Sequence, residues 1–205
     1  MDLKRTFDIS ASALGIVLLS PVFAAIAAAG AIHFRSNPFH LVQRIGKGAE
    51  PFRMIKFRSL TDEYDASGAL LNESQRMTGF GRFLRGTALD ELPQLINILK
   101  GDMSFVGPRP HYLNAWGDEI IPLEYSDLLR VRPGLTGPWQ VAAIGSQPTQ
   151  QDRFEAESQY VRNKPTLAKD MKLIIKTIPA FFKGHNGETV HSATAQPPKN
   201  DITGP

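Results

Sequence analysis

The 205-residue sequence predicts an α+β fold that is mostly helical. Three observations predict it: an apolar N-terminal run of membrane-helix length, later segments with apolar residues at helical spacing, and one alternating stretch typical of a small β-hairpin. We expect amphipathic, interfacial helices around this hairpin and a compact core. Residues 1–36 form the membrane segment, residues 37–183 the main domain, and residues 184–205 a tail whose polar, aperiodic composition predicts disorder.

Composition restricts the kinds of chemistry open to the chain. The formal net charge is +3 and the pI about 9.2, which suits an anionic partner such as a nucleotide, a phospholipid or a nucleic acid. The chain has no cysteine, so disulfides are excluded, and no cluster of cysteine and histidine suggests a zinc site. The hydrophobic content of 42% is enough for a core.

The first element is the apolar run from Ala11 to Ile32, which carries no charge. Its length matches the roughly 20 residues that cross a bilayer. Basic residues flank it on both sides, with Lys4 and Arg5 before it and Arg35 after it. Because positive charge prefers the cytoplasmic side, a simple span would place one flank on the unfavourable side.

Ser20 and Pro21 lie near the middle of this run. Proline removes a helical hydrogen bond, and a serine hydroxyl can satisfy the freed backbone group, so a bend is tolerable in lipid. These features favour a re-entrant helix that bends at Ser20 and Pro21 and returns to the same face. Three alternatives stay open: a kinked span, a buried core helix, and a signal peptide, against which Asp2 and Asp8 argue.

The second element is a hairpin. Residues 41–45 and 52–58 read as strands, and Gly46-Lys47-Gly48 supplies a turn between them. The polar, glycine-containing stretch 61–78 predicts a surface loop with some helix.

The third element holds two adjacent acids, Asp90 and Glu91, shortly after Arg85. We expect the pair at the start of a helix that has Pro93 just inside it and one apolar face, formed by Leu92, Leu95, Ile96 and Leu99. A helix N-terminus keeps acids ionised, which suits attack on phosphorus. The simpler alternative is that Asp90 only caps the helix.

The remaining elements are a short strand over residues 102–106 and helices over 120–131, 152–163 and 167–182. The last helix mixes lysines with bulky apolar residues, which fits a membrane interface and a packed core helix equally well. The rigid turn Pro108-Arg109-Pro110 follows the strand and would hold an arginine ready to bind phosphate. A loop over residues 132–141 contains glycines and Thr136 and could contact a nucleotide, although the chain has no Walker loop or Rossmann glycine pattern.

Four motifs in this order give a specific resemblance: Lys56-Phe57-Arg58, Leu89-Asp90-Glu91-Leu92-Pro93-Gln94, Gly107-Pro108-Arg109-Pro110 and Arg132-Pro133-Gly134-Leu135-Thr136-Gly137. Together with the apolar run they closely resemble the bacterial sugar transferase family, the monotopic phosphoglycosyl transferases. The resemblance covers residues 2–182. It implies a re-entrant membrane helix broken at Ser20 and Pro21, with both ends in the cytoplasm of a bacterium, at the inner membrane.

The resemblance also implies roles for individual residues. Asp90 would be the nucleophile that carries a covalent phospho-sugar, and Glu91 would help to hold Mg²⁺. Arg85 would assist catalysis. Phosphate and nucleotide contacts would come from a basic and polar set: Lys56, Arg58, Arg109, Arg132 and Thr136. The chain departs from the commoner family wording over residues 138–147, which leaves the sugar and nucleotide contacts of that loop undetermined.

The implied reaction moves sugar-1-phosphate from a UDP-sugar to membrane polyprenyl (undecaprenyl) phosphate, releases UMP and initiates exopolysaccharide synthesis. Galactose or glucose is favoured, and an N-acetylated sugar is the alternative. Expected partners are both substrates, membrane lipids and, by analogy, a second copy in a homodimer; no recognition motif suggests nucleic acid. The competing hypothesis is a membrane-anchored binding protein with a degenerate site.

Overall fold

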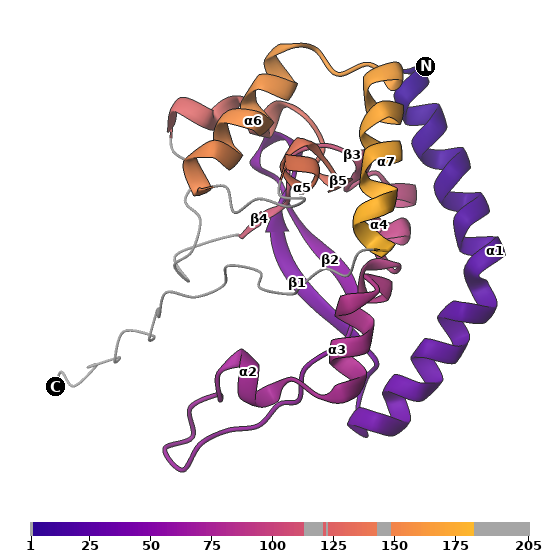
Figure 1. The fold of residues 1–205 in the computed structure, drawn as a ribbon, viewed down its shortest axis with the longest axis vertical. Coiled ribbons are helices and arrows are strands. Elements are labelled where there is room, and N and C mark those ends of the chain that lie inside the picture. The colour runs from indigo at the N-terminus through magenta and orange to yellow at the C-terminus, as the bar shows by residue number, and fades with distance from the viewer. Residues whose placement is uncertain (1, 113–120, 122, 143–148, 183–205) are drawn as a thin grey trace, which may run out of the picture.

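The computed structural model describes residues 2–112, 121, 123–142 and 149–182. Most of these residues are helical, with two small sheets between the helices. In Figure 1 the long helix α1, Leu3–Phe34, bows along one side, with α7, α4 and α3 beside it and the hairpin beyond them. The predicted mostly helical α+β class is confirmed, while the predicted tail lies outside the described residues.

Helix α1 continues through Pro21 without interruption. Pro21 has no N–H, so the carbonyl of Val17, four residues earlier, loses its helical partner. The Ser20 hydroxyl replaces that partner by donating to Val17 O at 2.8 Å. The helix is long and apolar enough to cross a membrane, and only 11% of the residues in its 18-residue apolar stretch are buried. The alternative of a buried core helix is therefore wrong for the described part of the chain.

Polar bonds fasten the N-terminal end of α1 to the main domain. Lys4 pairs with Asp170 of α7, Leu167–Phe182. Arg5 donates to the carbonyls at the end of α4, including Ile98 O at 2.6 Å. The buried carboxylate of Asp8 accepts from Phe105 N at 3.1 Å. These charges thus satisfy backbone and side-chain groups of the main domain at the root of the helix.

Apolar contacts hold the other end of α1 against the same domain. Gly30 lies against Pro38, where an added Cβ would come within 3.3 Å. His33 and Phe34 place their rings 5.3 and 6.1 Å from that of Phe80 on α3, Gly79–Gly86. Both ends of the apolar helix α1 therefore contact the same main domain.

The predicted hairpin is present as β1, Phe39–Ile45, and β2, Pro51–Phe57, joined through the 3₁₀ turn η1, Lys47–Ala49. The short strand β4, His111–Tyr112, which the sequence did not suggest, pairs with the other edge of β1. Asn97 occupies the free edge of β2: its amide accepts from Ile55 N at 3.0 Å and donates to Arg53 O at 2.8 Å. This side chain thereby fixes α4 in register with the hairpin.

The helix expected to begin at Asp90 begins later. Residues Leu89–Glu91 form a 3₁₀ turn, η2, entered through Ala88 in a left-handed conformation with φ of 53°. Helix α4, Gln94–Lys100, follows with Pro93 at its N-cap. Asp90 makes no capping bond, so the prediction that it caps or starts the helix is wrong. Residues 89–91 form a 3₁₀ turn and not the first turn of α4, because Pro93 fits only at the start of a helix.

The predicted apolar face of this helix is also only partly correct. Leu95 is buried, whereas Leu99 is 37% exposed. Ile98 and the polar side chain of Asn97 are fully buried instead. Asn97 is tolerated there because its amide pairs with the edge of β2.

A second sheet joins β3, Ser104–Val106, to β5, Gly134–Thr136, in parallel. Gly107 and Gly134 allow this close approach, since an added Cβ on either glycine would overlap the backbone of the other segment. Helix α5, Pro138–Ala142, follows directly. The parallel pair therefore places the Pro108-Arg109-Pro110 turn beside the loop that the sequence assigned to a nucleotide.

Four further elements complete the described fold: α2, Glu73–Arg76; η3, Leu123–Arg130; α6, Gln150–Arg162; and α7. The polar helix predicted over residues 152–163 and the helix over 167–182 are confirmed. The amphipathic segment predicted over residues 120–131 contains the 3₁₀ helix η3 where it is described.

Candidate active site

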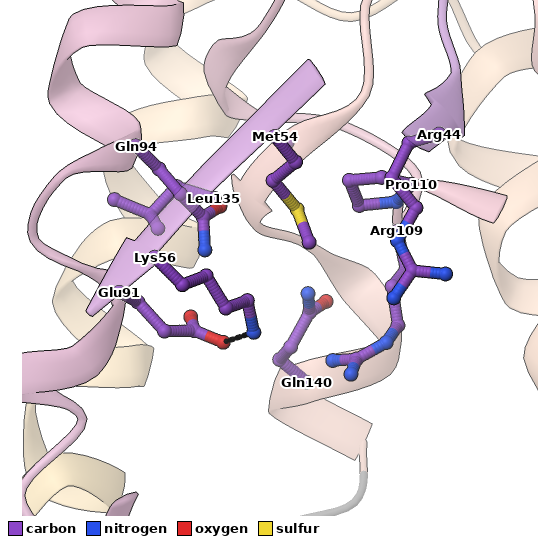
Figure 2. Close-up of a pocket in the computed structure, with 10 residues that line it drawn as sticks. Arg44, Met54, Lys56, Glu91, Gln94, Arg109, Pro110, Leu135 and Gln140 are labelled. Carbon is purple, nitrogen blue, oxygen red and sulfur yellow. Dashed lines mark hydrogen bonds and ion pairs between the residues drawn. The ribbon is translucent and has the colours of Figure 1, made fainter. Parts of the chain in front are cut away.

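A cleft opens between the hairpin, the acid turn η2 and the Pro108–Pro110 turn (Figure 2). Its lining combines three cations, one acid, two amides and a few small or apolar residues: Arg44, Met54, Lys56, Glu91, Gln94, Arg109, Pro110, Gly134, Leu135 and Gln140. Only Lys56, Glu91 and Arg109 of these were predicted as site residues. Such a strongly basic cleft suits a ligand with several negative charges.

Lys56 and Glu91 line what we call the acid side of the cleft, and we include in it the buried Asp90, which adjoins Glu91 but is not among the lining residues. Lys56, near the end of β2, donates from Nζ to Glu91 Oε1 at 2.8 Å, and Figure 2 shows this pair across from the arginines. The predicted neighbours Lys56 and Glu91 are thus brought together from segments 35 residues apart.

Asp90 is 7% exposed, which is unusual for a carboxylate. Burial, and then the adjacent charge of Glu91, raise its pKa to about 6, while Lys56 and Arg85 act in the opposite direction. A buried carboxyl with a perturbed pKa beside a charged cleft is a candidate functional residue. At neutral pH Asp90 is still mostly ionised, as a nucleophile must be.

Arg85 bonds to two side chains outside the cleft lining. It donates from Nε to Ser59 Oγ at 2.9 Å and pairs with Glu73. Its charge favours the ionised form of Asp90, although it is not among the residues that line the cleft. Arg85 therefore acts on the acid pair through the electric field in this structure.

Apolar packing ties the acid turn to the membrane helix. Leu89 and Leu92, on either side of the acid pair, pack into a cluster with Phe23 and Ala27 of α1 and with Phe57 of the hairpin. The position of Asp90 and Glu91 is therefore set directly against the apolar helix.

Arg44 and Arg109 form the arginine side of the cleft, opposite the Lys56–Glu91 pair in Figure 2. The sequence analysis missed Arg44. A signal for it existed in the hairpin register, which pairs Arg44 with Phe52 and Val42 with Met54, so that Arg44 shares a face with Lys56. An arginine on this face is 7% exposed, whereas Arg53 on the opposite face is exposed.

Gln94 and Gln140 were also missed. Gln94 begins α4 and is 3% exposed. Gln140 lies on α5 within the loop region predicted near the nucleotide, and its buried Oε1 has no hydrogen-bond partner among the described residues. Both amides point toward the cleft in Figure 2. No sequence signal distinguishes them from other glutamines.

Three predicted phosphate-binding residues lie outside the cleft lining. Arg58 pairs with Asp62, and its Nε donates to Asn37 O at 3.0 Å. Arg132 donates to Gly101 O at 2.7 Å, and the Thr136 hydroxyl lies 2.7 Å from that of Thr177. Contacts of these three with substrate remain predictions and would require these bonds to be exchanged.

The chain belongs to the bacterial sugar transferase family. The family model of that description matches residues 1–184. The predicted family and enzyme class are thereby confirmed, and the acid pair and basic cleft lie within the matched part of this sugar transferase.

Three relatives show the range of the family. The chain is 35% identical to an exopolysaccharide production protein, ExoY, of Rhizobium meliloti, with 86% of this chain and 84% of the relative covered. It is 34% identical to a UDP-glucose:undecaprenyl-phosphate glucose-1-phosphate transferase of Caulobacter vibrioides, covering 89% and 71%. It is also 34% identical to a UDP-N-acetylgalactosamine-undecaprenyl-phosphate N-acetylgalactosaminephosphotransferase of Aeromonas hydrophila, covering 89% and 44%.

Proposed function

We propose that this sugar transferase moves sugar-1-phosphate from a UDP-sugar to undecaprenyl phosphate through a covalent aspartyl intermediate, releases UMP and thereby starts an exopolysaccharide. The observation that carries the proposal is the buried, largely ionised Asp90, set between a cationic cleft and an apolar helix. A charged donor and a lipid-linked acceptor need these two environments side by side. The relatives named for undecaprenyl phosphate and exopolysaccharide production support it.

The first step requires neutralised charge, because a diphosphate repels a carboxylate. Arg44, Arg109 and Lys56 supply positive charge around the cleft. An oxygen of Asp90 attacks the β-phosphorus of the donor and forms a P–O bond. The bond from that phosphorus to the oxygen bridging to the α-phosphate breaks, and UMP leaves with the electron pair.

The second step restores the enzyme. A phosphate oxygen of undecaprenyl phosphate attacks the phosphorus held by Asp90, and the bond between that phosphorus and the carboxylate breaks. The products are undecaprenyl diphospho-sugar and the free Asp90 carboxylate. The contact of Leu89 and Leu92 with α1 supports delivery of the acceptor from the membrane side.

Mg²⁺ is the expected cofactor, and Glu91 would help to hold it, with waters and substrate phosphates as the other ligands. The described residues contain no cluster of three metal-binding side chains. That donor set still fits Mg²⁺, which is commonly bound through one or two carboxylates, waters and substrate phosphates. The raised pKa of Asp90, caused partly by Glu91, indicates an acid pair that a cation would relieve. When bound, the ion would screen the phosphate charges.

The membrane arrangement is part of the proposal. Both ends of α1 are fastened to the same main domain, and the apolar middle is exposed. A helix attached at both ends cannot pass simply through the bilayer while its domain stays on one side. We therefore infer that α1 is re-entrant and that the main domain faces the cytoplasm at the bacterial inner membrane.

Release of UMP tests the reaction. Purified enzyme is incubated with UDP-glucose, UDP-galactose and the two N-acetylated UDP-hexosamines, each with and without undecaprenyl phosphate. We expect one UMP per enzyme without acceptor, with the sugar phosphate on the Asp90 peptide by mass spectrometry, and continuous release with acceptor. We expect glucose or galactose to be preferred, in line with the relative named for glucose. Acceptor-dependent release with no burst would refute the covalent intermediate.

Cysteine labelling tests the topology, because the chain has no native cysteine that would react. Ser10 and Ser36 are exposed near the two ends of α1, whereas Ser12 is fully buried and unsuitable. Ser10→Cys and Ser36→Cys should both react with an impermeant maleimide from the cytoplasmic side only. Reaction of the two positions from opposite sides would refute the re-entrant helix.

A further inference from the structure

A buried carboxylate lies under the arginine side of the cleft. Glu157, on the inner face of α6, is fully buried, and its Oε1 accepts from Arg109 N at 2.9 Å. Prolines flank Arg109 on both sides and have no N–H, so this is the single backbone donor of the turn. Glu157 receives it.

The turn is fixed from two directions. Gly134 N donates to Pro108 O at 2.8 Å, which attaches the turn to β5. The bond to Glu157 attaches it to α6. Between these two supports the backbone of Arg109 has little freedom, and its guanidinium is directed into the cleft (Figure 2).

The buried side chains of Arg153 and His111 flank the Glu157 carboxylate. Arg153 lies one helical turn earlier, with Nε 3.6 Å from Oε1, and His111 Nε2 lies 3.8 Å from Oε2. These partners offset the cost of burying a charge.

Arg153 and His111 also lie next to other segments that contribute residues to the cleft. The Arg153 guanidinium carbon lies 5.9 Å from the ring centre of Trp139, the neighbour of Gln140. His111 pairs with Ile45, the neighbour of Arg44. The cluster of His111, Arg153 and Glu157 therefore adjoins three segments that each bring a residue to the cleft.

We propose that Glu157 is a positioning residue: it holds the Pro108–Pro110 turn so that Arg109 meets the phosphates of the donor. This inference rests on the proposed function, in which Arg109 binds those phosphates. A carboxylate that only stabilised α6 would not need to accept the one backbone N–H of this turn. Its effect on the reaction is transmitted through Arg109.

A double-mutant cycle tests this dependence. Glu157→Gln keeps the shape and removes the charge, and Glu157→Asp keeps the charge but shortens the reach. Each should lower kcat/KM for UMP release about tenfold, mainly through a higher KM for the UDP-sugar. In an Arg109→Ala background the same changes should cost less than about twofold. Equal losses in both backgrounds would overturn the proposal, because general damage to the fold does not depend on Arg109.

Hydrogen exchange gives a readout that needs no turnover. Within residues 108–110 the one exchangeable backbone amide is that of Arg109, and comparison of overlapping peptides isolates it. It should exchange faster in Glu157→Gln and Glu157→Asp than in the wild type. Glu155→Gln, at an exposed position of the same helix, is the matched control and should change neither exchange nor kcat/KM. Unchanged exchange in both Glu157 variants would refute the positioning role, whereas absence of UMP release by the wild type would refute only the proposed function.

Discussion

The two sides of the cleft are held in place by different forces. The acid side rests on an apolar cluster, in which Leu89 and Leu92 pack on the same buried residues as Phe23 of the apolar helix α1. The arginine side rests on polar groups, with the Arg109 amide bonded to the buried Glu157 of α6. Hydrophobic contact thus positions one side, and a hydrogen bond from a backbone amide to a buried carboxylate positions the other.

This difference separates two tasks. In the proposed reaction the acid side carries the attacking carboxylate, and it is tied to the apolar helix α1, so changes there should alter the chemical step. The arginine side carries charge toward the donor and is tied to the main domain, so changes there should alter donor affinity. The predictions below test that division, beginning with the largest effect.

Asp90→Asn should nearly abolish turnover, by about 10⁴-fold or more, because the amide cannot attack phosphorus. The variant should remain folded, since Asn fills the same space. Rates of UMP release and the circular dichroism spectrum are the measurements. Turnover close to the wild type would show that Asp90 is not the nucleophile.

Arg44→Gln should raise the KM for the UDP-sugar by about 10- to 100-fold, the value of one or two charge-assisted hydrogen bonds. The effect on kcat should be smaller. Arg53→Gln changes the same residue type on the opposite, exposed face of the hairpin and should leave both constants unchanged. A fall in kcat with constant KM for Arg44→Gln would contradict the division between the two sides.

The pH dependence of kcat/KM should follow Asp90 of the free enzyme. Its pKa is raised to about 6, so kcat/KM should fall about tenfold per unit as the pH drops below that value. A rate independent of pH between about 4.5 and 7 would contradict this assignment.

The same shift has a consequence for stability. The pKa of Asp90 in the folded protein lies above the ordinary aspartate value of 3.8, so the stabilising effect of protonated Asp90 is present below about pH 4 and is lost as the pH rises through 6. Asp90→Asn should therefore be more stable than the wild type at pH 7.5, by on the order of 2 kcal/mol. Thermal melts of the metal-free proteins at pH 4 and 7.5 measure the difference, and a destabilised variant at pH 7.5 would count against the burial penalty.

Ser20→Ala should have the smallest effect. It removes the donor that satisfies Val17 O and should lower the free energy of unfolding by about 1 kcal/mol. Because Phe23 of the acid-side cluster lies one turn away, kcat should fall slightly while KM stays constant. Chemical denaturation in detergent and steady-state kinetics measure both, with the exposed Ser10→Ala as the control.

Some failures of the sequence analysis have a clear physical origin. The helix expected at Asp90 begins only after Pro93, because a left-handed Ala88 leads into a 3₁₀ turn that holds both acids. Leu99 is exposed and Asn97 buried because β2 needed a partner for its free edge. Periodicity reports which residues are apolar, but a local pattern carries no information about an unpaired strand edge elsewhere in the chain.

The sequence by itself determined the family, the apolar helix with its Ser20–Pro21 pair, the hairpin and the acid pair, because each depends on neighbouring residues or a short motif. Only the tertiary structure decided that Arg44 joins the cleft while Arg58 and Arg132 bond elsewhere. It alone also placed Glu157 beneath Arg109, 48 residues away. Charged side chains are long and choose among several partners, so their final contacts depend on which backbone and which opposite charge the fold brings within reach.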